Sequence, residues 1–148
     1  MIRNEVEVAL NEVLSQCEHV ARRYRHSATI ASERRVAGLL NRLAAEREGA
    51  AEQLRFHLQA LGDTPDASDV EIDALREVGD RISARLAASG DAALLRGREQ
   101  DENRLRAVVD RALATPVPGN ARDVLERVRR ELAAAVEELT AAAGTAAQ

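Results

Sequence analysis

Aromatic side chains are nearly absent from this 148-residue sequence, which has no Trp, one Tyr (Tyr24) and one Phe (Phe56). Pockets for drug-sized ligands are usually lined by aromatic and other large apolar side chains. The 45% hydrophobic content comes mainly from Ala, Leu and Val, which predicts a closely packed core rather than a ligand pocket. We expect a single domain over residues 1–148, because a chain of this length buries a sufficient core on its own.

The sequence also lacks the basic excess that is typical of nucleic-acid-binding proteins. Every basic residue is an arginine, and 21 of them are outnumbered by 25 Asp and Glu, which gives a formal net charge of -4. Binding to nucleic acid is driven largely by cationic side chains that release counterions from the phosphates. Since this chain has no excess of such side chains, nucleic acid is not an expected partner. No stretch approaches the roughly 20 apolar residues that span a membrane, so we expect no membrane contact and a cytoplasmic location.

Only one cysteine is present, so no disulfide can form within the chain. Cys17 lies on an apolar stripe with Val13 and Val20, which predicts a small buried side chain rather than a catalytic thiol. Nucleophilic catalysis by this residue is not expected.

Apolar residues recur at intervals of three and four along most of the sequence, which is the period of an amphipathic helix. No strand pattern is present, so the expected fold class is all-α. The predicted helices cover about residues 5–28, 32–61 with Ser32 as N-cap and Gly62 as C-terminal glycine, 69–88, 91–114, and 120–140 with Asn120 as N-cap. Residues 141–148 are expected to fray.

Helix length favours one arrangement of these elements. Four of the predicted helices are on the order of 33 to 45 Å long, and the segment 69–88 is about 30 Å long as a helix. This segment is long enough to return along the bundle, which would make 91–114 parallel to 32–61. The expected architecture is therefore a ferritin-like four-helix bundle with a helical crossover between the second and third bundle helices.

Three stretches also resemble a known family. They are LNEVLSQCEHVARRY, LAAEREGAAEQLRFHLQALGDTP and the DE of DENRLRAVVDRAL. The chain is similar, over roughly residues 9–140, to the bacterial ferritin-like four-helix-bundle protein family of unknown function, although the family's His-Arg-x-Trp pattern is absent. Asp101-Glu102 corresponds to the family's Gly-Glu pair. The resemblance implies the same bundle fold and a stress-related role.

Glu102 lies in the middle of an apolar stripe between Leu95 and Val109, where a carboxylate either binds a metal or pairs with a cation. Di-metal bundles place Glu on two helices and Glu-x-x-His on the other two, and this sequence contains no Glu-x-x-His. One hypothesis is nevertheless a carboxylate-bridged iron or manganese site with a redox role. Its ligands would be the carboxylates nearest mid-height on the four long helices, Glu18, Glu46, Glu102 and Glu131.

The competing hypothesis is a buried ion-pair layer. Arg47 falls on the apolar stripe of the second helix, and Arg98 precedes Glu102 by one helical turn. Guanidinium groups bind carboxylates in a planar, bidentate way and can neutralise such a layer without a metal. This hypothesis predicts no catalytic residue and no cofactor. It favours a non-catalytic bundle that acts by protein–protein association, most simply as a homodimer.

Overall fold

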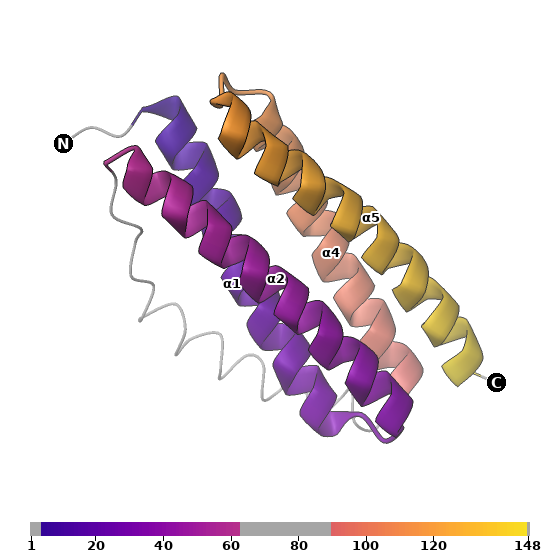
Figure 1. Cartoon of the computed structure of the whole chain (residues 1–148). Helices are drawn as coiled ribbons and strands as arrows, with labels where there is room; N and C mark the ends of the chain where they lie inside the picture. Colours follow the sequence, from indigo (N-terminus) through magenta and orange to yellow (C-terminus); the bar gives the residue numbers. More distant parts are fainter. Residues whose placement is uncertain (1–3, 63–89, 148) are drawn as a thin grey trace.

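The computed structural model describes residues 4–62 and 90–147, which form four α-helices packed side by side as an all-α bundle (Figure 1). The predicted crossover helix over residues 69–88 lies outside the described residues. No strand occurs in residues 4–62 and 90–147, as the all-α prediction requires. The helices are α1 (Glu5–Ile30), α2 (Arg34–Ala60), α4 (Asp91–Leu113) and α5 (Gly119–Ala146).

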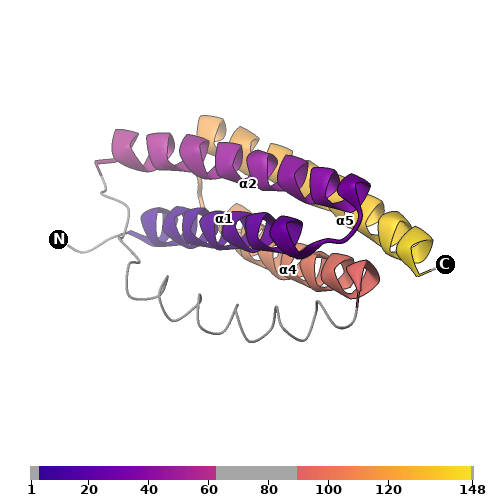
Figure 2. The same ribbon diagram turned by 90° about the horizontal axis from the view of Figure 1, so that it is seen from below.

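Each helix packs against two neighbours, because α1 and α5 both contact α2 and α4. Neighbouring helices are antiparallel, and the diagonally placed α2 and α4 run in the same direction (Figures 1 and 2). The Asp91 carboxylate at the start of α4 accepts hydrogen bonds of 2.9 Å from the backbone N–H groups of Ser32 and Glu33, next to the start of α2. The two helices therefore start at the same end of the bundle, as helix length predicted. The connection from Gly62 to Gly90 joins opposite ends.

Local capping explains the ends of the first two helices. Asn4 Oδ1 accepts a 2.8 Å hydrogen bond from the Glu7 N–H, and Asn4 Nδ2 donates to Glu7 Oε1 at 3.2 Å. These reciprocal contacts satisfy an N–H group that has no partner within the helix. After the C-terminus of α2, Gly62 has a φ of 84°, a left-handed conformation that glycine adopts without strain.

The predicted N-cap of the second helix was wrong. Its N-cap is Glu33, and the Ser32 side chain does not cap it. The Ser32 hydroxyl donates instead to the Asp91 carboxylate at 3.0 Å. This tertiary hydrogen bond holds the turn between α1 and α2 against the start of α4.

Both predicted ends of the last helix were also wrong. Helix α5 begins at Gly119 with Pro118 as its N-cap, whereas Asn120 already lies inside the helix. Residues 141–146 continue the helix instead of fraying. The reason is packing, because Ala143 is only 4% exposed and belongs to the apolar core.

The core between the helices consists mainly of Leu, Val and Ala. Fully burying one Val or Leu side chain stabilises the fold by roughly 1.5 to 3 kcal/mol, so this core supplies most of the driving force for folding. Cys17 is fully buried, as predicted. No helix in the described part of the chain is long and apolar enough to cross a membrane.

Substitution of Asp91 by Ala is expected to lower the free energy of unfolding by about 1 kcal/mol at neutral pH, a typical value for a lost capping carboxylate. Burial raises the pKa of Asp91, but hydrogen bonds from Ser32 and Glu33 outweigh this effect, so the pKa lies below its ordinary value. A lowered carboxyl pKa stabilises the fold above the pKa of the unfolded chain, and this stabilisation is lost as pH falls through the folded-state pKa.

The difference in unfolding free energy between the wild type and Asp91→Ala is therefore expected to shrink below about pH 4. Urea denaturation of both proteins over a series of pH values measures it. A difference that is independent of pH would show that the Asp91 carboxylate does not hold the turn.

Candidate functional site

A fully buried ion pair joins α2 to α4 across the centre of the bundle. Arg47 Nε donates to both carboxylate oxygens of Glu102, at 3.0 and 3.2 Å, and both side chains are 0% exposed. The helical period places them there, because Arg47 shares the buried stripe of α2 with Leu43 and Glu102 shares that of α4 with Leu105. Each charged residue occupies a position that an apolar side chain would otherwise fill.

Tyr24 on α1 is a third member of this buried group. Its hydroxyl donates a hydrogen bond to Glu102 Oε1. Burial and the Glu102 charge raise the pKa of Tyr24 above its ordinary value, so the phenol remains a proton donor. The Glu102 carboxylate therefore receives hydrogen bonds from two helices, α1 and α2. Sequence reasoning did not predict the Tyr24 contact, because a buried tyrosine on an apolar stripe does not reveal its partner.

Two further carboxylates approach the same guanidinium. Arg47 Nη1 donates to Glu131 Oε2 on α5 at 3.4 Å. Arg47 Nη2 lies 3.8 Å from Glu46 Oε2, within ion-pair range but too far for a hydrogen bond. Among the described residues, the buried Nη2 atom of Arg47 has no hydrogen-bond partner. Contacts with Arg47 thus come from α4 and α5 as well as from its own helix.

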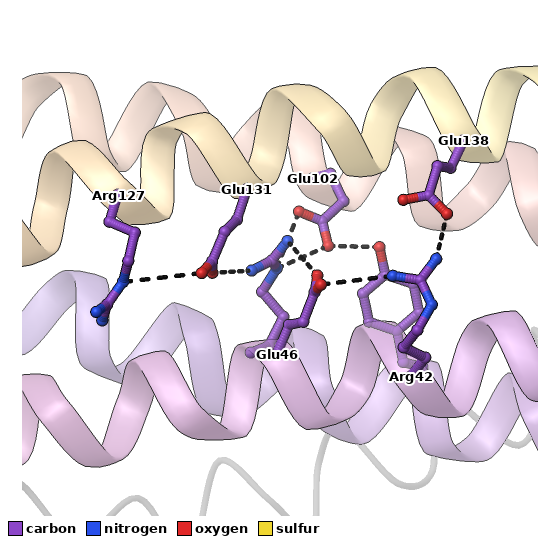
Figure 3. A network of polar contacts seen from close by, with 8 residues as sticks. Arg42, Glu46, Glu102, Arg127, Glu131 and Glu138 are labelled. Atoms are coloured by element: carbon purple, nitrogen blue, oxygen red, sulfur yellow. Dashed lines mark hydrogen bonds and ion pairs between the residues drawn. The ribbon is translucent and has the colours of Figure 1, made fainter.

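The charges continue outward along α2 and α5 (Figure 3). Arg127 lies 3.8 Å from Glu131, Arg42 lies 3.5 Å from Glu46, and Arg42 also contacts Glu138. These outer side chains are between 33% and 49% exposed. Solvent-exposed ion pairs typically contribute about 0 to 1 kcal/mol, so the energetic weight of this network lies at its buried centre.

The structure distributes the four predicted metal ligands differently from a metal site. Glu46, Glu102 and Glu131 all contact the Arg47 guanidinium, whereas Glu18 contacts Arg55 on the surface between α1 and α2. Within residues 4–62 and 90–147, no group of three or more His, Cys, Asp and Glu is placed to hold a metal ion. Arg47 supplies the positive charge that a metal would supply in the alternative hypothesis.

Arg98 does not join Glu102, which corrects that part of the predicted layer. Arg98 Nε lies 3.0 Å from Asp101 Oδ2, and its Nη1 donates to Ser27 Oγ at 3.0 Å. Asp101 also accepts a 2.8 Å hydrogen bond from Arg23 Nε. The side chain of Arg98 thus extends toward α1, while the Glu102 carboxylate is bound by Tyr24 of α1 and Arg47 of α2. Sequence reasoning missed Asp101, since it placed only Glu102 of this pair on the buried stripe.

The protonation of Glu102 depends on the arginine beside it. Burial raises the pKa of Glu102, and the charge of Arg47 together with hydrogen bonds from Tyr24 and Arg47 partly opposes this rise. Burial lowers the pKa of Arg47, but the charge and hydrogen bond of Glu102 outweigh this effect and leave the pKa raised. Arg47 therefore stays charged, and it is the main group that favours the ionised form of Glu102.

The polar and thiol groups at the centre of the bundle are closed off from solvent. Cys17, Tyr24, Arg47 and Glu102 are each 0% exposed. Burial raises the pKa of the Cys17 thiol to about 12, so the nucleophilic thiolate is not formed near neutral pH. The layer is better suited to fixing the relative positions of the helices through hydrogen bonds of defined geometry.

Comparisons of this chain with protein-family models, with curated proteins and with solved structures found no match. They assign no family. The four-helix all-α bundle is therefore established by the geometry of the helices themselves.

The Glu102→Met variant is expected to lose about 3 to 5 kcal/mol of unfolding free energy, because it leaves the Arg47 guanidinium buried without its main counter-charge. Arg47→Met is expected to be similarly destabilised at neutral pH and less so in acid. The reason is the raised pKa of the Glu102 carboxyl group. Such a group stabilises the fold below its pKa in the unfolded chain, and this stabilisation is lost as pH rises through its pKa in the folded state.

The double variant Arg47→Met/Glu102→Met is expected to recover most of the loss, since it removes both buried charges. Urea denaturation at neutral and mildly acidic pH measures all four proteins. The exposed pair Arg42 and Glu138 provides the matched control, because its double Met variant is expected to change stability little. Additive losses in the Arg47 and Glu102 series would contradict a coupled pair.

The buried thiol gives a separate prediction. Cys17 is expected to react with a thiol reagent only when the protein unfolds, because it is 0% exposed and protonated. A cysteine pKa that rises from 9.0 to about 12 on folding stabilises the fold below pH 9.0 and loses this contribution as pH rises. Labelling of native and urea-unfolded protein compares the two states. Rapid stoichiometric labelling of the native protein would show that Cys17 is accessible.

Proposed function

We propose that this protein is a non-catalytic helical bundle that acts by protein–protein association. The observation that carries the proposal is the position of Phe56. This residue is the only Phe in the chain, and it is 67% exposed on α2. Phenylalanine is enriched at protein–protein interfaces relative to the rest of the surface. In a protein with so few aromatic residues, an exposed Phe is better explained by contact with another molecule than by the packing of its own core.

The interior gives independent support. Its polar layer is buried, and Arg47 already provides hydrogen bonds and charge to the central carboxylate of Glu102. General acid–base catalysis requires a titratable side chain within hydrogen-bond reach of a substrate. Glu102 and Tyr24 are fully buried against each other and do not meet this requirement. The burial of these two groups supports a role at the surface.

Ferritin-like descent is part of the proposal. Antiparallel neighbours with one long connection between α2 and α4 are also the connectivity of ferritin-like bundles. In this interpretation Arg47 takes the position of the cation that carboxylates hold in a metal-binding bundle. The iron or manganese alternative has less support, because Glu46, Glu102 and Glu131 already contact the guanidinium. The stress-related role and the cytoplasmic location stay predictions.

Sedimentation velocity over a wide range of protein concentration tests this proposal. We expect a reversible species heavier than the monomer, and we expect Phe56→Ala to shift the equilibrium toward the monomer without altering helix content. Elemental analysis of the wild type and of Glu102→Ala is the companion measurement. A strict monomer that retains no partner would contradict the association, and stoichiometric metal lost in Glu102→Ala would favour the di-metal alternative.

A further inference from the structure

The outward face of α2 carries a row of residues that have no role in the bundle interior. The row contains four residues, Gly38, Ala45, Gly49 and Phe56. They follow one another at intervals of seven, four and seven positions, and all four are exposed. At 3.6 residues per turn they lie within about 40° of one another around the helix. Helix α2 contacts α1 and α5 with its other faces, and α2 and α5 together form the upper surface in Figure 2. This row is called the α2 seam below.

The two glycines of the α2 seam are not required by packing within the molecule. A Cβ atom at Gly38 or Gly49 would meet no atom within 4 Å, so the single chain has room for a larger side chain at both positions. Both also lie inside a helix, where glycine is less favourable than alanine. A close approach by a second molecule gives these glycines a role that the isolated bundle does not.

We infer that the α2 seam binds a second copy of this chain, with the two α2 helices antiparallel. This inference rests on the proposed association function. In a two-fold symmetric interface, a contact between residues i and j is repeated between j and i. A pairing that places Phe56 over Gly38 also places Ala45 opposite Gly49, because both pairs are centred on position 47. The row is therefore self-complementary in the antiparallel direction.

Size complementarity supports this register. The Phe56 ring of each copy would lie over Gly38 of the other copy, where there is no side chain to displace. Ala45 and Gly49 near the two-fold axis would let the helices approach at the short end of the usual 8–10 Å separation. Both exposed Phe56 rings, each 67% exposed in the single chain, would be buried by the same contact.

Charge supports the antiparallel direction as well. The same pairing, centred on position 47, places Arg42 of one copy at the same height along the helices as Glu52 of the second copy. The two-fold symmetry repeats this pair. Arg42 is 49% exposed and contacts Glu46 and Glu138 in its own chain, while Glu52 is exposed and has no ion-pair partner among the described residues. A parallel arrangement in the same register would bring Arg42 against Arg42. Opposite charges across an interface favour the correct register, and like charges oppose the alternative.

Cross-linking of two variants, each with one added surface cysteine, tests the register directly. Ala45→Cys and Gly49→Cys are prepared separately, and buried Cys17 remains in both. A disulfide needs Cα atoms about 4.4–6.8 Å apart. The antiparallel seam predicts that oxidation cross-links the two variants when they are mixed and that neither variant cross-links efficiently with itself.

Each outcome separates this inference from the function on which it rests. A disulfide only in the mixture supports the α2 seam. Disulfides within each variant alone would show a parallel interface and overturn the register. A dimer by sedimentation without any cross-linking would place the interface on another face, so the inference would fail while the association function would stand. A protein that stays monomeric at every concentration would contradict the α2 seam and homodimer formation together.

Substitutions on the seam provide a second, independent measurement. We expect Gly38→Leu and Phe56→Ala each to raise the dimer dissociation constant by roughly tenfold or more, because each acts twice in a symmetric interface. The matched control is Gly144→Leu, at an exposed glycine of α5 where a Cβ would also meet no atom within 4 Å. An unchanged constant for both seam variants, or an equal change for the control, would overturn the inference.

Discussion

The buried pair of Arg47 and Glu102 is the interaction on which the centre of this bundle depends. Hydrogen bonds at this one height involve all four helices, since Tyr24 comes from α1 and Glu131 from α5. Apolar Leu and Ala contacts alone discriminate weakly between alternative helix offsets, whereas hydrogen bonds require one geometry. The pair therefore contributes less to net stability than to the choice of a single helix register, a role that buried polar groups have in some other helical assemblies.

This pair also supports the proposal of a function at the surface. The guanidinium of Arg47 neutralises the central Glu102 carboxylate and donates hydrogen bonds to it. The centre of the bundle therefore holds an ion pair rather than an unpaired reactive group. The other unusual feature lies on the surface of α2. There, exposed Phe56 shares one face with two glycines, Gly38 and Gly49, that packing within the chain does not require. A rigid bundle with fixed helix positions is a suitable support for such a surface, since its exposed face keeps a constant shape.

Much of this arrangement could be predicted from the sequence, because periodicity reports which residues of a helix face the core. It identified the four long helices and the burial of Arg47 and Glu102. Helical spacing does not report which neighbouring helix a long side chain reaches, so Arg98 was assigned to Glu102 although it contacts Asp101. Periodicity is equally silent in an alanine-rich segment, which is why the packing around Ala143 was missed.

Nuclear magnetic resonance of the Arg47 side chain measures the central contact most directly. If Arg47 Nε–H is held between the two Glu102 oxygens and excluded from water, its proton signal will persist with slow solvent exchange at neutral pH. The same signal will lose its protection in Glu102→Ala. Fast exchange in the wild type, equal to that of the exposed Arg104, would contradict a buried ion pair at the centre of the bundle.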